Sequence, residues 1–448
     1  MSFTADKQTL EDLNLLGKYK ASSIYSLFNQ VKTDGGERLL QEMFQHPLTT
    51  VDEINDRSNL FRYFQDKQLG FPFSNQIFGK IDNYLSDTSN SSYGAALAGL
   101  LYQQLQASFL HDEQFAVRKE GLSTTIQALI TLKQFLVQLK QAGAYQKEYT
   151  ILVNLLNDSR LQKMLETKST DQLSLPQIAR YDHLLKHILR DQMDALLKSV
   201  YKLDVYIAVS SVASERGFGY ATAFPAAANL MRAKAVWHPA LLNGIANPFD
   251  LHQQKSMIFL TGANMAGKST LMKSFGIAVY LSHMGFPVAA KGLEFSVSEG
   301  LYSSINVPDN LNQGYSHFYA EVLRVKRVAE EVSSGKNLVV LFDELFKGTN
   351  VKDAYDATLA VTEAFSKYSN CLFIISTHII EVGEELQQKS SPIQFSFLPT
   401  VMEGNIPRYT YLLEEGITTD RQGMTIIENE GILEMLCIED QVFHSTED

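Results

Sequence analysis

The chain has 448 residues, of which 45% are hydrophobic and 20% charged, and this composition excludes an intrinsically disordered protein. Two cysteines exclude a disulfide framework, and the formal net charge is −11. No basic and apolar leader pattern opens the sequence, and the most apolar stretch, residues 95–110, contains three glutamines. We therefore expect a cytoplasmic protein that does not enter a membrane.

The negative charge is concentrated in the second half of the chain. Residues 1–232 hold 24 basic and 24 acidic residues, and residues 233–448 hold the remaining 15 basic and 26 acidic ones. A dedicated nucleic-acid-binding protein usually carries a basic patch or a basic domain. The overall charge therefore gives no support to DNA binding, although a local basic stripe is compatible with a neutral total.

Residues 1–232 are predicted to form an all-helical domain. Apolar residues recur at three- and four-residue spacing in residues 127–139 and 184–200, as they do on one face of a helix. The second pattern predicts one continuous helix over residues 181–203, about 35 Å long at about 1.5 Å per residue. A helix of this length serves either as a lever or as an ordinary bundle helix, and the spacing leaves both open.

Residues 233–448 have a different pattern. Three short apolar runs, residues 257–261, 338–342 and 371–375, are separated by helical stretches. Buried strands that alternate with helices predict an α/β domain with a mostly parallel sheet. Residues 394–397 and 408–411 alternate polar and aromatic residues, which predicts an antiparallel edge pair. The predicted fold class is therefore α + α/β.

Residues 262–269 have the form G-x-x-x-x-G-K-S of a phosphate-binding loop, between an apolar run and a helical pattern. The two glycines let successive backbone N–H groups turn inward and hold phosphate oxygens. Lys268 supplies a positive charge for the β- and γ-phosphates, and the Ser269 hydroxyl is a predicted Mg²⁺ ligand. The predicted cofactors are ATP and Mg²⁺. The predicted nucleotide-binding residues are Gly262, Ala263, Asn264, Met265, Ala266, Gly267, Lys268, Ser269 and Thr270.

Two acidic residues, Asp343 and Glu344, directly follow the apolar run 338–342. An acid at the carboxyl end of a buried strand beside a phosphate loop is placed to bind Mg²⁺, so we assign this role to Asp343. Glu344 is predicted to orient or deprotonate the attacking water. His378 follows another buried strand and is predicted to sense the γ-phosphate. Glu344, His378 and Lys268 are thus the candidate catalytic residues.

Together these motifs resemble the MutS family of mismatch-repair ATPases, which are ABC-type ATPases. The resemblance rests on the phosphate loop at residues 261–270, a serine-containing motif at 309–321, the Asp-Glu motif at 343–349 and the Thr-His pair at 377–378. Residues 237–239 and 246–248, before the loop, also resemble stretches of the family. Residues 26–57 resemble the start of the family's helical core domain more weakly. The sequence begins where that core domain begins, so we expect a short form without the N-terminal mismatch-recognition domain.

The resemblance implies a helical core and lever domain over residues 1–232 and a P-loop ATPase domain over residues 233–448. It also implies a homodimer formed through the ATPase domain, in which Ser316 of the partner subunit completes the nucleotide site.

We therefore expect an ATPase that drives a dimeric DNA-binding clamp in DNA repair or recombination, with mismatched or branched double-stranded DNA as its partner. The alternative is an ATP-driven dimeric clamp that acts on a protein partner, which the neutral first half favours. A third class, the P-loop kinases of small molecules, would need an arginine-bearing lid over the acceptor, and we recognise no such segment.

Overall fold

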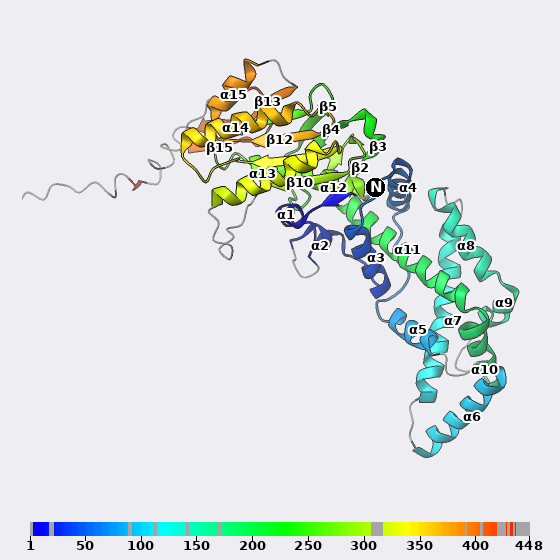
Figure 1. Ribbon diagram of the computed structural model, residues 1–448. Helices are drawn as coiled ribbons and strands as arrows, with labels where there is room; N and C mark the ends of the chain where they lie inside the picture. Colours follow the sequence, from blue (N-terminus) through cyan, green and yellow to red (C-terminus); the bar gives the residue numbers. More distant parts are fainter. Residues whose placement is uncertain are drawn as a thin grey trace, which may run out of the picture.

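The computed structural model describes residues 3–17, 22–87, 92–110, 114–139, 143–167, 173–305, 317–389, 392–403 and 406–418, together with residues 427, 431, 432 and 435. Figure 1 shows an elongated molecule with two parts. The helical half comprises residues 24–216, and the sheet half comprises residues 219–418. Apart from β1 (Thr4–Ala5), which joins the sheet, helices come first in the chain and a mostly parallel sheet follows, which confirms the predicted α + α/β class.

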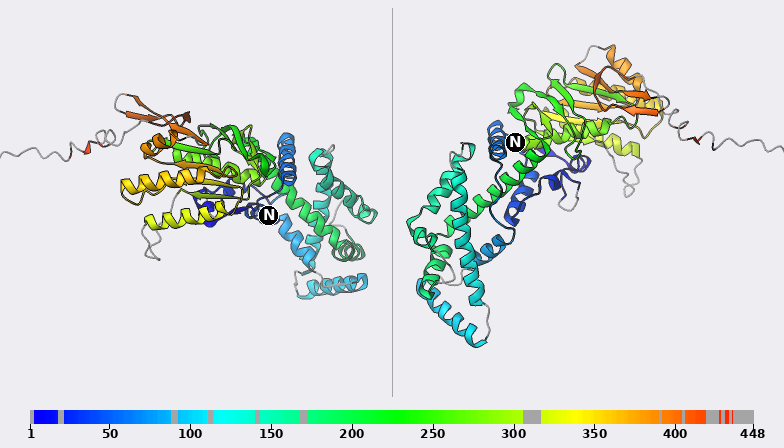
Figure 2. Two further views of the ribbon diagram at one scale, coloured as in Figure 1. Left: turned by 45° about the horizontal axis from the view of Figure 1, so that its top comes forward. Right: turned by 180° about the vertical axis from the view of Figure 1, so that it is seen from behind.

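The helical half is organised around α11 (Arg190–Arg216), which runs from the sheet half far into the helical half and packs on α3 and α4 (Figures 1 and 2). A buried carboxylate of α11, Asp204, accepts hydrogen bonds from the backbone N–H groups of Lys32 and Thr33 at 2.9 and 2.8 Å. This carboxylate therefore fixes the start of α3. The other helices are α2 (Ile24–Phe28), α3 (Asp34–Gln45), α4 (Val51–Lys67), α5 (Ile77–Ser86), α6 (Tyr93–Leu110), α7 (Gln114–Gln138), α8 (Gln146–Leu156), α9 (Ser159–Leu165) and α10 (Leu175–His183).

The prediction of one continuous helix over residues 181–203 was wrong. Helix α10 ends at His183, a π-helical turn spans Leu184–Ile188, and α11 begins at Arg190. The turn carries the buried Lys186, whose amine lies 3.3 Å from Asp182 and 3.1 Å from Asp87, while Arg118 also pairs with Asp182. The partners of Lys186 and Asp182 lie in other parts of the helical half: Asp87 directly follows α5, and Arg118 is in α7. The apolar spacing within residues 181–203 gives no information on such distant partners.

The sheet half is built on a seven-stranded sheet in which every neighbouring pair is parallel except the last. Along β11, Val339 and Leu341 face the core that contains α12 (Lys268–His283). Val340 and Phe342 face the core of α13 (His317–Ser333) and α14 (Val351–Ser366). Helices thus cover both faces, which is why the predicted strands are uninterrupted apolar runs. The strand order is β1 (Thr4–Ala5), β10 (Gly300–Ser304), β11 (Leu338–Asp343), β12 (Leu372–Ser376), β6 (Met257–Gly262), β13 (Ile393–Leu398) and β16 (Glu414–Glu415).

A smaller sheet covers the other side of α12, where the rings of Phe249 and Phe275 lie 4.9 Å apart. It contains β3 (Thr222–Phe224), β9 (Glu294–Ser296), β4 (Leu230–Val236) and β5 (Asn247–His252), with β8 (Ala290–Lys291) paired to β4. Two short strands, β2 (Gly219–Tyr220) and β7 (Pro287–Val288), form a separate pair. Helix α12 is therefore enclosed between two sheets.

The predicted antiparallel pair of residues 394–397 and 408–411 was also wrong. Residues 394–397 lie in β13, which is parallel to β6 and antiparallel only to β16. Residues 408–409 lie in β15 (Ile406–Tyr409), which pairs with β14 (Thr400–Glu403). A local hairpin closes a much shorter loop than the predicted pair would, so its ordering cost is lower. Alternation of polar and aromatic residues identifies a segment as a strand, but it does not identify the strand with which that segment pairs.

The two halves meet at the C-terminal end of α12. Arg57 of α4 donates to the Met284 carbonyl at 3.0 Å, and Ser58 donates to the Gly285 carbonyl at 3.2 Å. These bonds satisfy carbonyls that a helix end leaves without partners. The ring of Phe286 then packs edge-on against the rings of Phe28, Phe44 and Phe61. Within the described ranges, no helix is both long and apolar enough to span a bilayer.

Candidate nucleotide site

The predicted phosphate loop connects β6 to α12, with one glycine at each end. Gly262 has φ +148° and Gly267 has φ +99°, backbone conformations that residues other than glycine rarely adopt. A Cβ atom at Gly267 would lie 2.9 Å from a ring carbon of Tyr411. Gly267 directly precedes the first residue of α12, so the free backbone N–H groups at the N-terminus of this helix face the loop.

Lys268 is buried at the base of this loop. Its amine donates to the carbonyls of Gly262 and Ala263 at 2.9 and 3.2 Å, and it lies 3.9 Å from a carboxylate oxygen of Glu344. Burial lowers the pKa of Lys268, and the neighbouring carboxylates oppose this shift. A phosphate oxygen held by the loop would be a stronger, charged acceptor for the amine than these carbonyls.

Asp343 lies between two hydroxyl groups at the end of β11. The Ser269 hydroxyl donates to Asp343 Oδ2 at 2.5 Å, and the Ser376 hydroxyl donates to Oδ1. Asp343 and Ser376 are direct partners on the parallel strands β11 and β12, and Ser376 is paired with β6 on its other side. A carboxylate and a hydroxyl beside a phosphate loop are oxygen donors of the kind that Mg²⁺ takes, with the remaining ligands from phosphate and water.

Glu344 begins a sharp turn after β11. It has φ +52° and Phe346 has φ +61°, so two left-handed residues lie within three positions. The backbone N–H of Glu344 donates to the Ser376 carbonyl at 3.0 Å, which fixes the turn to β12. Its carboxylate lies between two amines, those of Lys268 at 3.9 Å and Lys347 at 4.0 Å. Left-handed non-glycine residues are found disproportionately at functional sites, where surrounding contacts hold them.

The structure brings together only part of the predicted residue set. Lys268, Ser269, Asp343 and Glu344 converge at the carboxyl ends of three adjacent strands. His378 is exposed after β12, and among the described residues no hydrogen bond or ion pair joins it to these four. Ser316 lies outside the described residues. Of the remaining loop residues, Ala266 is buried, and Asn264, Met265 and Thr270 are exposed.

A cavity beside the loop was not predicted. It has a volume of about 460 Å³, and its lining includes His238, Ile245, Gly267, Thr270 and Tyr411. Burial lowers the pKa of His238, and the charge of Lys273 lowers it further. The imidazole therefore favours its neutral form, which can stack on a flat, uncharged ring system. The apolar and aromatic lining next to the phosphate loop suits a nucleoside.

Asn247 of β5 holds Tyr411 at this cavity. Its amide donates to the Tyr411 carbonyl at 2.9 Å, and its side-chain oxygen accepts the N–H of Leu413 at 2.7 Å. Asn247 is buried, so these bonds fix the backbone of a segment that is 164 residues away in sequence. Local sequence motifs do not predict that Tyr411 lies beside the phosphate loop, because its position depends on the path of the chain after β15.

Comparison with known proteins finds similarity to MutS proteins. Residues 258–442 match the family model described as MutS domain V. The chain is 22% identical to a DNA mismatch repair protein MutS of Leuconostoc mesenteroides, in a match that covers 85% of this chain and 55% of that protein. It is 26% identical to the MutS of Petrotoga mobilis, over 55% of this chain and 30% of that one.

The chain thus spans about half the length of the first of these relatives, and a smaller part of the second. Domain V begins inside β6 and includes the loop, Asp343, Glu344 and His378. These matches agree with the resemblance drawn from the motifs: residues 258–442 are similar to MutS domain V, and most of the chain is similar to MutS proteins.

Proposed function

We propose that this protein binds and hydrolyses ATP with Mg²⁺, and that ATP drives two chains into a clamp on DNA during DNA repair. The observation that carries the proposal is the convergence of Lys268, Ser269, Asp343 and Glu344 around the loop between β6 and α12. The names of the two relatives, both DNA mismatch repair proteins, support the DNA role.

Each residue has a distinct task in this proposal. The loop N–H groups and Lys268 bind the phosphates, and Ser269 and Asp343 hold the metal ion. Mg²⁺, when bound, would neutralise negative charge on the phosphate oxygens. Glu344 accepts a proton from the attacking water or orients it, since its carboxylate is within 4 Å of the lysine that holds the phosphates. His378 is the proposed sensor of the γ-phosphate.

Pairing of two chains is the second part of the proposal. The start of α13, with Ser316, would reach the nucleotide held by the other chain, so that bound ATP stabilises the pair by mass action. Large apolar side chains next to the site are unusually exposed: Met265 in the loop at 73%, Val351 at the start of α14 at 79%, and Leu242 near the cavity at 81%. Exposed apolar side chains that gather around one site are typical of an interaction surface.

The ATPase part is tested with two variants. Lys268→Ala removes the phosphate-binding cation, so ATP affinity falls, as measured with a fluorescent ATP analogue. Glu344→Gln keeps the shape but not the base, so the variant binds ATP, stays paired and no longer hydrolyses it. Glu363→Gln, a partly exposed acid of α14 in an ion pair with Lys389, is the matched control and keeps normal turnover. Hydrolysis by Glu344→Gln at the wild-type rate would show that the base assignment is wrong.

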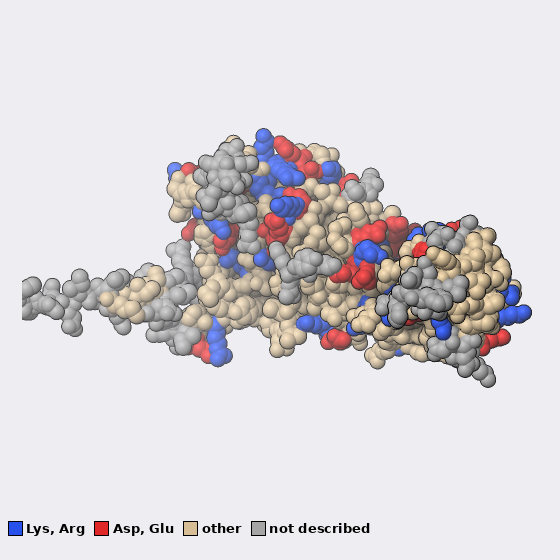
Figure 3. Space-filling view, turned by 90° about the horizontal axis from the view of Figure 1, so that it is seen from below, with Lys and Arg blue, Asp and Glu red and all other residues tan. Residues whose placement is uncertain are grey.

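A clamp on a protein partner is the second candidate. The observation that favours it is charge: residues 1–232 are neutral in total, and Figure 3 shows blue and red side chains interspersed on the face in view. Among the described residues of that face, no continuous basic stripe is visible.

DNA binding separates the two candidates. Homoduplex, mismatched and branched DNA are each titrated without nucleotide, with ADP and with a non-hydrolysable ATP analogue, across a salt series. Affinity that depends on nucleotide and falls steeply with salt supports the DNA clamp, since phosphate contacts release counterions. No binding at low salt in any nucleotide state, with hydrolysis intact, would favour the protein partner.

A further inference from the structure

The first residues of the chain are built into the sheet half. β1 forms the edge of the seven-stranded sheet beside β10, with Thr4 opposite Gly300 and Ala5 opposite Leu301. Helix α1 (Lys7–Asp12) follows at once and packs on β10. Figure 1 shows this segment beside β10 and close to α13. The N-terminal segment, residues 3–15, therefore lies against elements that are about 300 positions later in the sequence.

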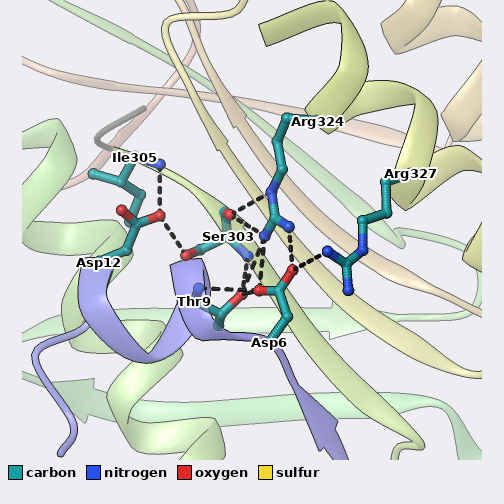
Figure 4. A network of polar contacts seen from close by, with 7 residues as sticks. All are labelled: Asp6, Thr9, Asp12, Ser303, Ile305, Arg324 and Arg327. Carbon is teal, nitrogen blue, oxygen red and sulfur yellow. Dashed lines mark hydrogen bonds and ion pairs between the residues drawn. The ribbon is translucent and has the colours of Figure 1, made fainter. Parts of the chain in front are cut away.

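A buried polar network joins the N-terminal segment to α13 (Figure 4). The Arg324 guanidinium donates to both carboxylate oxygens of Asp6, through Nη1 to one and through Nη2 at 3.1 Å to the other. Nη2 also donates to the Thr9 hydroxyl at 3.2 Å, and Nε donates to the Ser303 carbonyl at 3.1 Å. Every guanidinium nitrogen thus has an acceptor, as a cation removed from water requires.

The charge of Asp6 is part of this network. Burial by itself would raise the pKa of Asp6, but the hydrogen bonds and charge of Arg324 outweigh it and lower the pKa. The same carboxylate caps α1, because it accepts the N–H of Thr9 at 3.0 Å. One ionised side chain therefore fixes the start of α1 and holds α13 beside it.

A second carboxylate of the segment fixes the end of β10. Asp12 Oδ2 accepts the Ser303 hydroxyl at 2.7 Å and the Ile305 N–H at 2.9 Å. Ile305 is the last described residue before residues 306–316, and α13 begins directly after them. The N-terminal segment thus holds the end of β10 through Asp12, and it holds α13 through Asp6.

We propose that Asp6 and Arg324 are positioning residues, which hold α13 where its start can reach the nucleotide bound by a second chain. The inference rests on the proposed function, in which the start of α13 completes the partner's site. Neither residue touches the phosphate loop of its own chain, so both act on pairing through the placement of a helix.

The N-terminal segment also contacts the helical half. The carbonyls of Asn14 and Leu15 accept the N–H groups of Ile24 and Tyr25 in α2, at 2.9 and 3.0 Å. Helix α2 in turn packs on α11, the long helix of that half. A contiguous set of contacts therefore leads from α11 through residues 3–15 to α13 without passing through the phosphate loop. Such an arrangement lets the state of the helical half bias the pairing of two chains.

The test uses the full chain with Glu344→Gln, which retains ATP. Asp6→Asn is added because asparagine keeps the shape and the helix cap but removes the charge that faces Arg324. Arg324→Lys, which keeps the charge but not the forked donors, is the second variant. Lys7→Ala is the matched control, since Lys7 is an exposed residue of the same helix. ATP affinity is measured on dilute, single chains, and pairing in saturating ATP is measured by sedimentation.

We expect Asp6→Asn to weaken ATP-dependent pairing about tenfold or more, while ATP affinity of the single chain stays within about twofold of the parent. Arg324→Lys changes pairing in the same direction, and Lys7→Ala changes neither quantity. Unchanged pairing in both variants, or a parallel loss of pairing and ATP affinity, would overturn the positioning role. A parent chain that stays single with ATP bound would instead refute the proposed function, and this inference with it.

Discussion

The buried histidine His283 predicts a defined loss of stability on mild acidification. It lies at the end of α12, where Nδ1 donates to the Leu48 carbonyl at 3.1 Å and Nε2 lies 2.9 Å from the Ser298 hydroxyl. Because the carbonyl of Leu48 can only accept, the neutral ring carries its proton on Nδ1. Burial lowers the pKa of His283 to about 4, and the bond to Leu48 opposes this shift. The folded protein therefore holds a neutral imidazole where the two halves meet.

The sign and size of the effect follow from linkage. Below pH 6.5 the unfolded chain binds a proton that the folded chain excludes, so stability falls as the pH drops from about 6.5 and levels off below about 4. At 1.36 kcal/mol for each pH unit of this interval, the full loss is about 3 kcal/mol. About 2 kcal/mol of it has already been lost at pH 5.

The assay is urea unfolding at pH 7.5 and pH 5, followed by fluorescence of Trp237, the one tryptophan of the chain. His283→Asn keeps a donor near the Nδ1 position but does not titrate, so it should lose about 2 kcal/mol less on acidification than the wild type. His46→Asn replaces an exposed histidine and should keep the wild-type response. Equal losses in His283→Asn and the wild type would refute the reasoning.

Three further substitutions have expected outcomes. Asp182→Ala leaves Arg118 and Lys186 buried without their shared counter-charge, and should lower the free energy of unfolding by about 3–5 kcal/mol in urea titrations. Asp204→Ala removes the acceptor at the start of α3 and should cost about 2–4 kcal/mol, with less than 1 kcal/mol contradicting its role. Gly267→Ala should reduce ATP affinity by about tenfold or more at unchanged helix content, because its φ is +99°.

The sequence alone was sufficient for the central strands and for the loop between β6 and α12. Residues 338–342 and 371–375 are continuous apolar runs because helices bury both faces of the sheet, and this requirement is local to each strand. The pattern at residues 262–269 is equally local, since its glycines and lysine serve one turn before one helix. Asp343 and Glu344 could be placed near it because parallel strands align their carboxyl ends at one edge.

Only the tertiary structure decided which distant segments meet. The attachment of residues 3–15 to β10 and α13, the π-helical turn at Leu184–Ile188 and the approach of Tyr411 to the loop all depend on contacts between remote parts of the chain. Buried polar side chains such as Asp6 and Asn247 fix these contacts, and a polar residue in a sequence carries no mark of burial. Periodicity reports which face of an element is apolar, whereas the neighbour of that face is set by packing of the whole chain.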